Sequence, residues 1–118
     1  MKRVSFLLRS KRRDVMQIDG IFTTAGSSAV TGADNTGGGV TARSTTGKIT
    51  VTLPYFVETV FSYSAQIKIA TPDGTYALVD SVTANSSGNC VMTIGTYNSS
   101  HAAADTTGVV TWNLVVRE

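Results

Sequence analysis

The residues that could do chemistry are few and lie far apart in the sequence. The chain has one histidine, His101, with Asp105 four residues further on. A Ser-His-Asp hydrolase needs a nucleophile, a base and an orienting acid, and no nucleophile-elbow motif accompanies this pair. The only glutamates, Glu58 and Glu118, do not mark the carboxylate pair that glycoside hydrolysis requires. We therefore expect no catalytic residues and a protein that is not an enzyme.

Motifs for metals and cofactors are equally weak. A lone cysteine, Cys90, cannot form an intramolecular disulfide or build a zinc site by itself, so we expect it to be a small core side chain. Asp34 with Asn35 is the best calcium contact on offer, although turn chemistry explains this pair more simply. The run Gly37–Gly39 lacks the lysine and serine of a phosphate-binding loop. We expect no metal and no cofactor.

The first thirteen residues form a basic arm. They hold six of the ten cations, so the rest of the chain is net negative. Such an arm can bind nucleic acid, an anionic membrane or an acidic protein surface. The rest of the chain has no basic aromatic face to continue a nucleic-acid track. We therefore favour a grooved, acidic protein partner, with a solvated, frayed tail as the alternative. The candidate binding residues of the arm are Lys2, Arg3, Phe6, Leu7, Leu8, Arg9, Lys11, Arg12 and Arg13.

The arm differs from a targeting sequence. Its apolar run, Val4–Leu8, is short, and cations at 9–13 follow where a signal peptide would have its cleavage site. No stretch approaches the ~20 apolar residues of a transmembrane helix. We expect a soluble protein that begins at Met1 and has no membrane partner.

The chain divides into three segments. Residues 1–24 comprise the basic arm and an extended segment, residues 25–39 are expected to be a mobile or ligand-dependent glycine-rich loop, and residues 40–118 are expected to form the body. A chain of 118 residues is long enough for one core and too short for two cores that are each stable.

Alternating apolar and polar residues predict strands throughout the body. Residues 40–44 and 48–53 flank a Thr-Thr-Gly turn and predict a hairpin. In residues 59–70, alternation from Phe61 to Ile69 predicts a half-buried strand, and residues 109–117 alternate in the same way. About six or seven antiparallel strands are expected, so the predicted fold is all-β, a small β-sandwich or jelly-roll-like barrel.

The body also resembles a known family. The segment GVTARSTTGKITVTL at 39–53, a long alternating strand and the closing VTWNLVVR at 110–117 resemble the decoration, or cement, proteins of tailed bacteriophage heads. The resemblance covers residues 37–118. It implies a non-catalytic virion protein, made in the host cytoplasm, that sits on the capsid surface as a homotrimer. There it would bridge neighbouring subunits of the major capsid protein and stabilise the head, without direct contact to nucleic acid.

A second interpretation stays open. The same sandwich could serve as a receptor- or carbohydrate-binding module of a head or tail fibre. Such a module would present aromatic side chains on exposed loops, and Tyr55, Phe56 and Tyr97 are the candidates.

Overall fold

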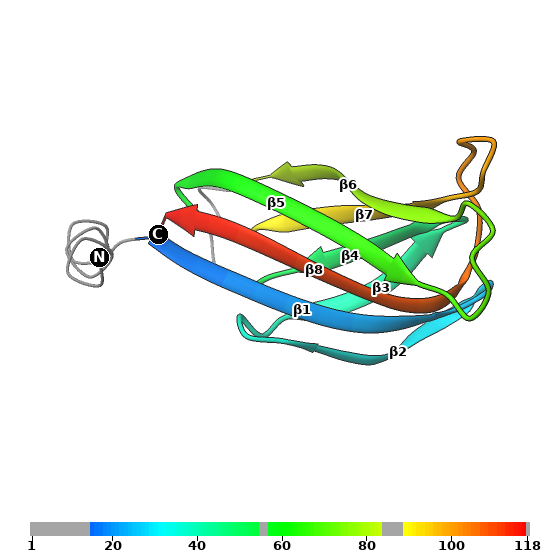
Figure 1. The fold of residues 1–118 in the computed structure, drawn as a ribbon. Coiled ribbons are helices and arrows are strands. Elements are labelled where there is room, and N and C mark those ends of the chain that lie inside the picture. The colour runs from blue at the N-terminus through cyan, green and yellow to red at the C-terminus, as the bar shows by residue number, and fades with distance from the viewer. Residues whose placement is uncertain (1–14, 55–56, 84–88, 118) are drawn as a thin grey trace, which may run out of the picture.

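The computed structural model describes residues 15–54, 57–83 and 89–117, and the regular structure in these residues is entirely β-strand. Eight antiparallel strands form two four-stranded sheets, in the orders β2-β1-β8-β5 and β3-β4-β7-β6 (Figure 1). The prediction of an all-β sandwich is confirmed, with eight strands rather than six or seven. The strands are β1 (Val15–Ala25), β2 (Ser28–Asn35), β3 (Val40–Thr45), β4 (Lys48–Thr52), β5 (Thr59–Lys68), β6 (Tyr76–Thr83), β7 (Val91–Tyr97) and β8 (Thr107–Arg117).

The first sheet is organised around β8, which lies between β1 and β5 and pairs with both. Its alternating sequence directs every second side chain into the core, as a strand with one buried face requires. These inward side chains are at most 3% exposed. They are Val110, Trp112, Leu114 and Val116.

A glycine makes room for the largest of these side chains. Gly20 of β1 is the cross-strand partner of Trp112, and a Cβ atom at Gly20 would lie 2.1 Å from the indole ring. The ring therefore occupies the space that a side chain on β1 would need, and only glycine fits there.

The second sheet contains the hairpin that the sequence predicts. The chain reverses between β3 and β4 at Thr46 and Gly47, and Gly47 has a φ of 66°. Strands β4 and β7 lie at the centre of this sheet and bury their inward side chains against the first sheet. Those side chains include Ile49, Val51, Met92 and Ile94.

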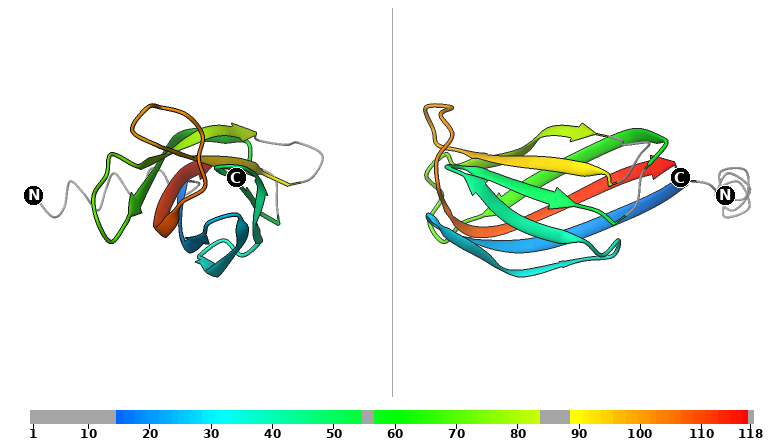
Figure 2. Two further views of the ribbon diagram at one scale, coloured as in Figure 1. Left: turned by 90° about the vertical axis from the view of Figure 1, so that its right-hand side faces the viewer. Right: turned by 180° about the vertical axis from the view of Figure 1, so that it is seen from behind.

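The connections between strands gather at two ends of the sandwich (Figures 1 and 2). We call the end where β1 begins and β8 finishes the arm end. The opposite end, the distal end, carries the turns at 26–27 and 46–47 and the connections 69–75 and 98–106.

The prediction of a loop throughout residues 25–39 is wrong for residues 28–35, which form β2. β1 continues to Ala25, the chain turns at Gly26, and β2 then pairs with β1 from Ser28 to Asn35. β2 is an edge strand that buries little, so small and polar residues suffice, and two register shifts in this pair accommodate its irregular sequence. The sandwich body expected at 40–118 thus also includes β1 and β2.

The prediction that Phe61 lies on the buried face of its strand is also wrong. A register shift between Val60 and Ser62 places an extra residue in β5, and Phe61 is 40% exposed. A β-bulge of this kind interrupts the two-residue period, which a sequence pattern alone does not reveal. Tyr63, predicted on the same face, is 52% exposed as well, and the prediction holds only from Ala65 onward, where Ala65 and Ile67 pack against the core.

Candidate functional site

The basic arm joins an inner strand of the first sheet. The candidate binding residues from Lys2 to Arg13 lie outside the described residues, but their point of attachment does not. Val15 pairs with Arg117 of β8, which in turn pairs with Thr59 of β5. From Val15 to Ala25, every residue of β1 is paired with β8. The arm is therefore continuous in sequence with a strand that is paired with β8 along its whole length.

An aromatic and a cationic side chain meet beside this attachment. The Arg117 guanidinium carbon lies 5.2 Å from the centroid of the Phe61 ring, a cation-π geometry. The Arg117 carbonyl accepts a hydrogen bond from the Glu58 amide at 2.9 Å, which fixes the start of β5 to the end of β8. The arm end thus presents the partly exposed ring of Phe61, which contacts the Arg117 guanidinium.

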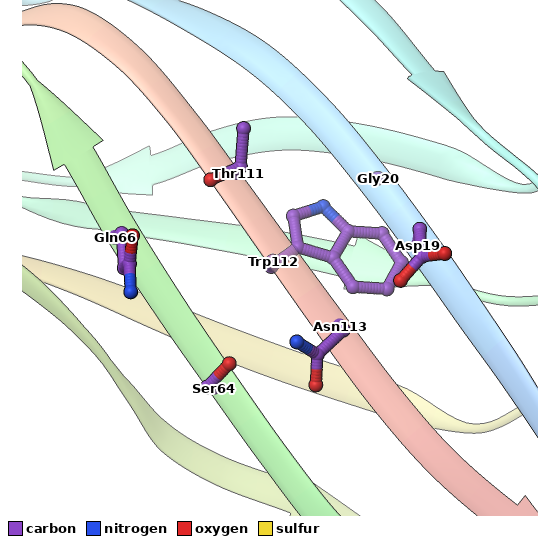
Figure 3. A pocket seen from close by; sticks show the side chains of 7 residues that line it. All are labelled: Asp19, Gly20, Ser64, Gln66, Thr111, Trp112 and Asn113. Atoms are coloured by element: carbon purple, nitrogen blue, oxygen red, sulfur yellow. The ribbon is translucent and has the colours of Figure 1, made fainter.

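The outer face of the first sheet carries a polar hollow of about 340 Å³ (Figure 3). One cross-strand row, Asp19, Asn113 and Ser64, takes a residue from each of β1, β8 and β5, and the neighbouring row adds Thr111 of β8 and Gln66 of β5. We call this hollow the sheet hollow. Its lining consists of Asp19, Ser64, Gln66, Thr111 and Asn113, with Gly20 and Trp112 between the rows.

Most of the polar side chains that line the sheet hollow have no hydrogen-bond partner in the described part of the chain. Among the described residues, only Asp19 has a side-chain hydrogen-bond partner there, the Gln17 amide at 3.0 Å. Its lining contains hydroxyl, amide and carboxylate groups and no cation. Such a set of groups can accept several hydrogen bonds from a ligand and favours a cationic one.

A second hollow, of about 300 Å³, shares Asp19 with the first and extends across β1 to β2. It adds a second carboxylate, Asp34, and the side chain of Ile21, which is 42% exposed. Asp34 and Ile21 are cross-strand partners and so share the outer face. We call this the edge hollow.

At the distal end, Asp105 holds two loops together. Its carboxylate accepts bonds from Arg43 Nε at 3.0 Å and Nη2 at 2.9 Å, and from the Gly47 amide at 3.0 Å. The Arg43 hydrogen bonds, followed by the Gly47 amide, lower the pKa of Asp105. This bidentate pair fastens the β7–β8 connection to the β3–β4 hairpin.

Two buried threonines complete the distal end. Thr24 Oγ1 accepts from the Gly108 amide at 2.9 Å and lies 3.2 Å from Thr106 Oγ1, which links β1 to the start of β8. Thr96 Oγ1 donates to the Ala104 carbonyl at 2.8 Å. Both threonines are at most 4% exposed, so these bonds satisfy polar groups that water does not reach.

A hydrogen-bonded cluster of Lys48, Asp80 and Tyr97 lies on the outer face of the second sheet. Lys48 Nζ donates to the Asp80 carboxylate and, at 2.6 Å, to the Tyr97 hydroxyl, which itself donates to Asp80. These hydrogen bonds, the one to Asp80 first, raise the pKa of Lys48. Gly95 provides the space, since a Cβ atom there would lie 2.6 Å from Asp80 Oδ2.

The candidate aromatic residues of the binding-module interpretation are only partly placed. Tyr55 and Phe56 lie outside the described residues. The Tyr97 ring stacks on Tyr76 with centroids 5.4 Å apart, and its hydroxyl is engaged by Lys48 and Asp80. Tyr97 is therefore part of an internal contact network.

The structure does not join His101 and Asp105 into a catalytic pair. His101 Nδ1 lies 2.9 Å from the Tyr76 hydroxyl, whereas the Asp105 carboxylate is bonded to Arg43 and Gly47. His101 has a φ of 65°, in a tight turn in which the Asn98 side chain accepts bonds from two backbone amides.

Cys90 is fully buried, as expected, and burial raises the pKa of its thiol. In the described part of the chain, no three histidine, cysteine, aspartate or glutamate residues are grouped so that they could hold a metal ion. No helix in the same residues is long and apolar enough to cross a bilayer.

Comparisons with known proteins give no family for this chain. No protein-family model matches it, and neither the curated proteins nor the solved structures yield a match. The site is therefore interpreted from its geometry. Sequence reasoning missed both hollows, although the polar residues at alternate positions of 62–68 and 111–113 were a signal that this face is exposed.

Proposed function

We propose that this protein is a capsid decoration protein of a tailed bacteriophage, which binds the assembled head and stabilises it by bridging subunits of the major capsid protein. The observation that carries the proposal is the continuity between the basic arm and β1. Six cations lie in the first thirteen residues, and the strand that follows is paired with β8 at each of its residues.

This attachment suits a protein that must resist force. A pull on the arm acts along β1, parallel to the strand, so it loads the hydrogen-bonded pairs with β8 together rather than one after another. Each such bond contributes about 1 kcal/mol to stability, and the ladder contributes through their sum. A head protein that holds neighbouring subunits together needs a connection of this kind between its contact segment and its core.

The arm supplies affinity through charge and through repetition. Its arginines can form paired hydrogen bonds with carboxylates on a capsid surface, and Phe6, Leu7 and Leu8 add apolar contact. In a homotrimer, three arms acting together raise the overall affinity by orders of magnitude over a single arm. A trimer that spans several capsid subunits opposes their separation.

Co-sedimentation with undecorated heads of the parent phage tests the proposal. The wild-type protein is expected to pellet with heads at low salt and to be released as salt rises, because exposed charge contacts are screened. A full-length variant with Arg9, Lys11, Arg12 and Arg13 replaced by glutamine is expected to remain in the supernatant. Lys68→Gln, which removes an exposed cation from the body, is the control and is expected to bind normally. Undiminished binding of the arm variant would contradict the proposal.

A further inference from the structure

We propose that the outer face of the first sheet is a docking site for the basic arm of a second copy of this chain, with an arginine of that arm seated in the sheet hollow. The inference concerns the free protein and does not rest on the capsid as partner. It assigns a receptor to the arm within the protein's own assembly.

The chemistry of the sheet hollow suits a guanidinium group. Asp19 provides a carboxylate, while Asn113 and Ser64 follow it across the sheet in the same cross-strand row. Neighbouring strands are about 4.8 Å apart, so three strands offer acceptors to the five N–H groups of one arginine fork. No cation lines the hollow to oppose the entry of a positive charge.

The edge hollow supplies what the rest of the arm needs. Asp34 gives a second carboxylate for a second cation, and the exposed side chain of Ile21 gives an apolar contact. The arm contains both kinds of group, since the apolar residues 6–8 lie between its cations. The two hollows share Asp19, so one extended segment can occupy both.

Overall charge points to the same occupant. Outside the first thirteen residues the chain has four cations and eight carboxylates, and two of those cations, Arg43 and Lys48, are already paired with Asp105 and Asp80. The body is therefore acidic and the arm is basic, so arm and body of different copies attract each other.

The route of the chain favours a neighbouring copy over the arm's own body. Val15 is already paired in the sheet, and Asp19 lies four residues further along the same strand, about 13 Å inward from the start of the arm. To reach its own Asp19, the arm would have to reverse direction immediately before Val15. Residues 1–14 contain neither glycine nor proline, and Asp14 is the only residue beside Val15 that favours a turn. An extended arm of thirteen residues reaches about 45 Å, enough to meet a neighbour.

Each copy would then give one arm and receive one. Contacts of this head-to-tail kind form a symmetric ring where the rotation between copies closes, and closure makes the arm contacts mutually reinforcing.

Sedimentation equilibrium of the full-length protein in 50 mM and 500 mM NaCl tests the inference. The wild-type protein is expected to self-associate at low salt and to dissociate at high salt. The double variant Asp19→Asn with Asp34→Asn is expected to self-associate about tenfold more weakly, because it loses two exposed ion pairs, each of modest strength. The matched control, Glu58→Gln with Asp73→Asn, removes the same charge elsewhere and is expected to behave as wild type.

A charge-exchange experiment identifies the two contacting surfaces. One variant combines Arg9→Glu, Lys11→Glu, Arg12→Glu and Arg13→Glu, and the other combines Asp19→Lys with Asp34→Lys. Each variant alone is expected to be monomeric, and a mixture is expected to associate. Failure of the mixture to associate would overturn the proposal, as would a monomeric wild-type protein or unchanged association of the Asp19→Asn, Asp34→Asn variant.

The same variants separate this inference from the proposed function. Asp19→Asn with Asp34→Asn weakens self-association but leaves the arm intact, so it still tests head binding. If the wild-type protein associates through this face but never binds heads, only the capsid proposal fails. If it binds heads but the face variants associate normally, only the docking site fails.

Discussion

The distal end and the outer face of the first sheet are both rich in polar side chains, but they use these side chains differently. At the distal end, Asp105, Thr24 and Thr96 are each bonded to backbone groups of another segment. On the outer face, Ser64 and Asn113 have no side-chain partner among the described residues. The density of polar groups is therefore a poor guide to a binding surface, and their bonding state is a better one.

The difference follows from what each region must satisfy. Loops at the distal end have backbone amides and carbonyls outside the sheet ladders, and buried groups of this kind need partners. On the outer face, β8 is paired on both sides, with β1 and with β5, so its backbone does not need the side chains there as partners. Side chains there remain available for a ligand.

The largest expected effect comes from breaking the distal end at Gly47. A Cβ atom there would lie 2.6 Å from the Ala104 amide nitrogen, in a left-handed backbone conformation. Gly47→Ala is expected to lower the free energy of unfolding by about 3 kcal/mol, measured by urea denaturation. Gly26→Ala is the control, since Gly26 has a similar φ but no atom within 4 Å of the added Cβ. It should cost only about 1 kcal/mol, and equal losses would refute the steric argument.

A smaller loss is expected from Thr24→Val, which keeps the shape of the side chain but removes its hydroxyl. The Gly108 amide would lose its acceptor, so the free energy of unfolding should fall by about 1–3 kcal/mol. Thr23→Val, on the opposite face of β1, should change it by less than about 0.5 kcal/mol. Indistinguishable urea midpoints for the two variants would show that the buried bond contributes nothing.

The Asp105 pair should also make the distal end sensitive to acid. The pKa of Asp105 is lowered in the folded protein, so its stabilisation is complete above the ordinary carboxyl pKa and is lost as pH falls through the lowered value. Asp105→Asn should therefore lower Tm at pH 7, and the difference from wild type should shrink as pH falls below the ordinary carboxyl pKa. Asp34→Asn, which removes an equal charge away from the distal end, is the control in the same thermal scans. A difference that stays constant with pH would exclude this linkage.

The smallest effect on stability is expected on the outer face. Ser64→Ala combined with Asn113→Ala should change the free energy of unfolding by less than about 0.5 kcal/mol, because neither side chain is bonded to a described residue. The same variant should nevertheless weaken self-association in sedimentation equilibrium. A stability loss comparable with that of Thr24→Val would erase the contrast between the two regions.

Much of the fold could be predicted from alternation alone. Residues 109–117 and the hairpin around Gly47 have one buried and one exposed face, so the two-residue period is visible in their sequence. Alternation did not predict two segments correctly. β2 lies at a sheet edge, where the lack of large apolar residues made it resemble a loop. The bulge at Phe61 arises from the register in which β5 pairs with β8. The sequence of β5 alone shows no pattern that predicts it.

The candidate site was less predictable than the fold. The sheet hollow unites Asp19 with Ser64 and Asn113, which are far apart in the sequence and meet only through the pairing of β1, β8 and β5. A single sequence contains no record of that alignment. The concentration of charge in the arm, by contrast, is evident from residue order alone.

The reactivity of the Cys90 thiol can report how often the folded protein opens. It is the only sulfhydryl in the chain, it is fully buried, and its carbonyl accepts the Leu53 amide at 2.9 Å where β4 ends. An alkylating reagent can therefore modify only those molecules in which the core has transiently parted at that point. The labelling rate, followed by intact mass, reports how often this happens without any engineered probe. Covalent dimers on a non-reducing gel would likewise arise only from molecules that have opened.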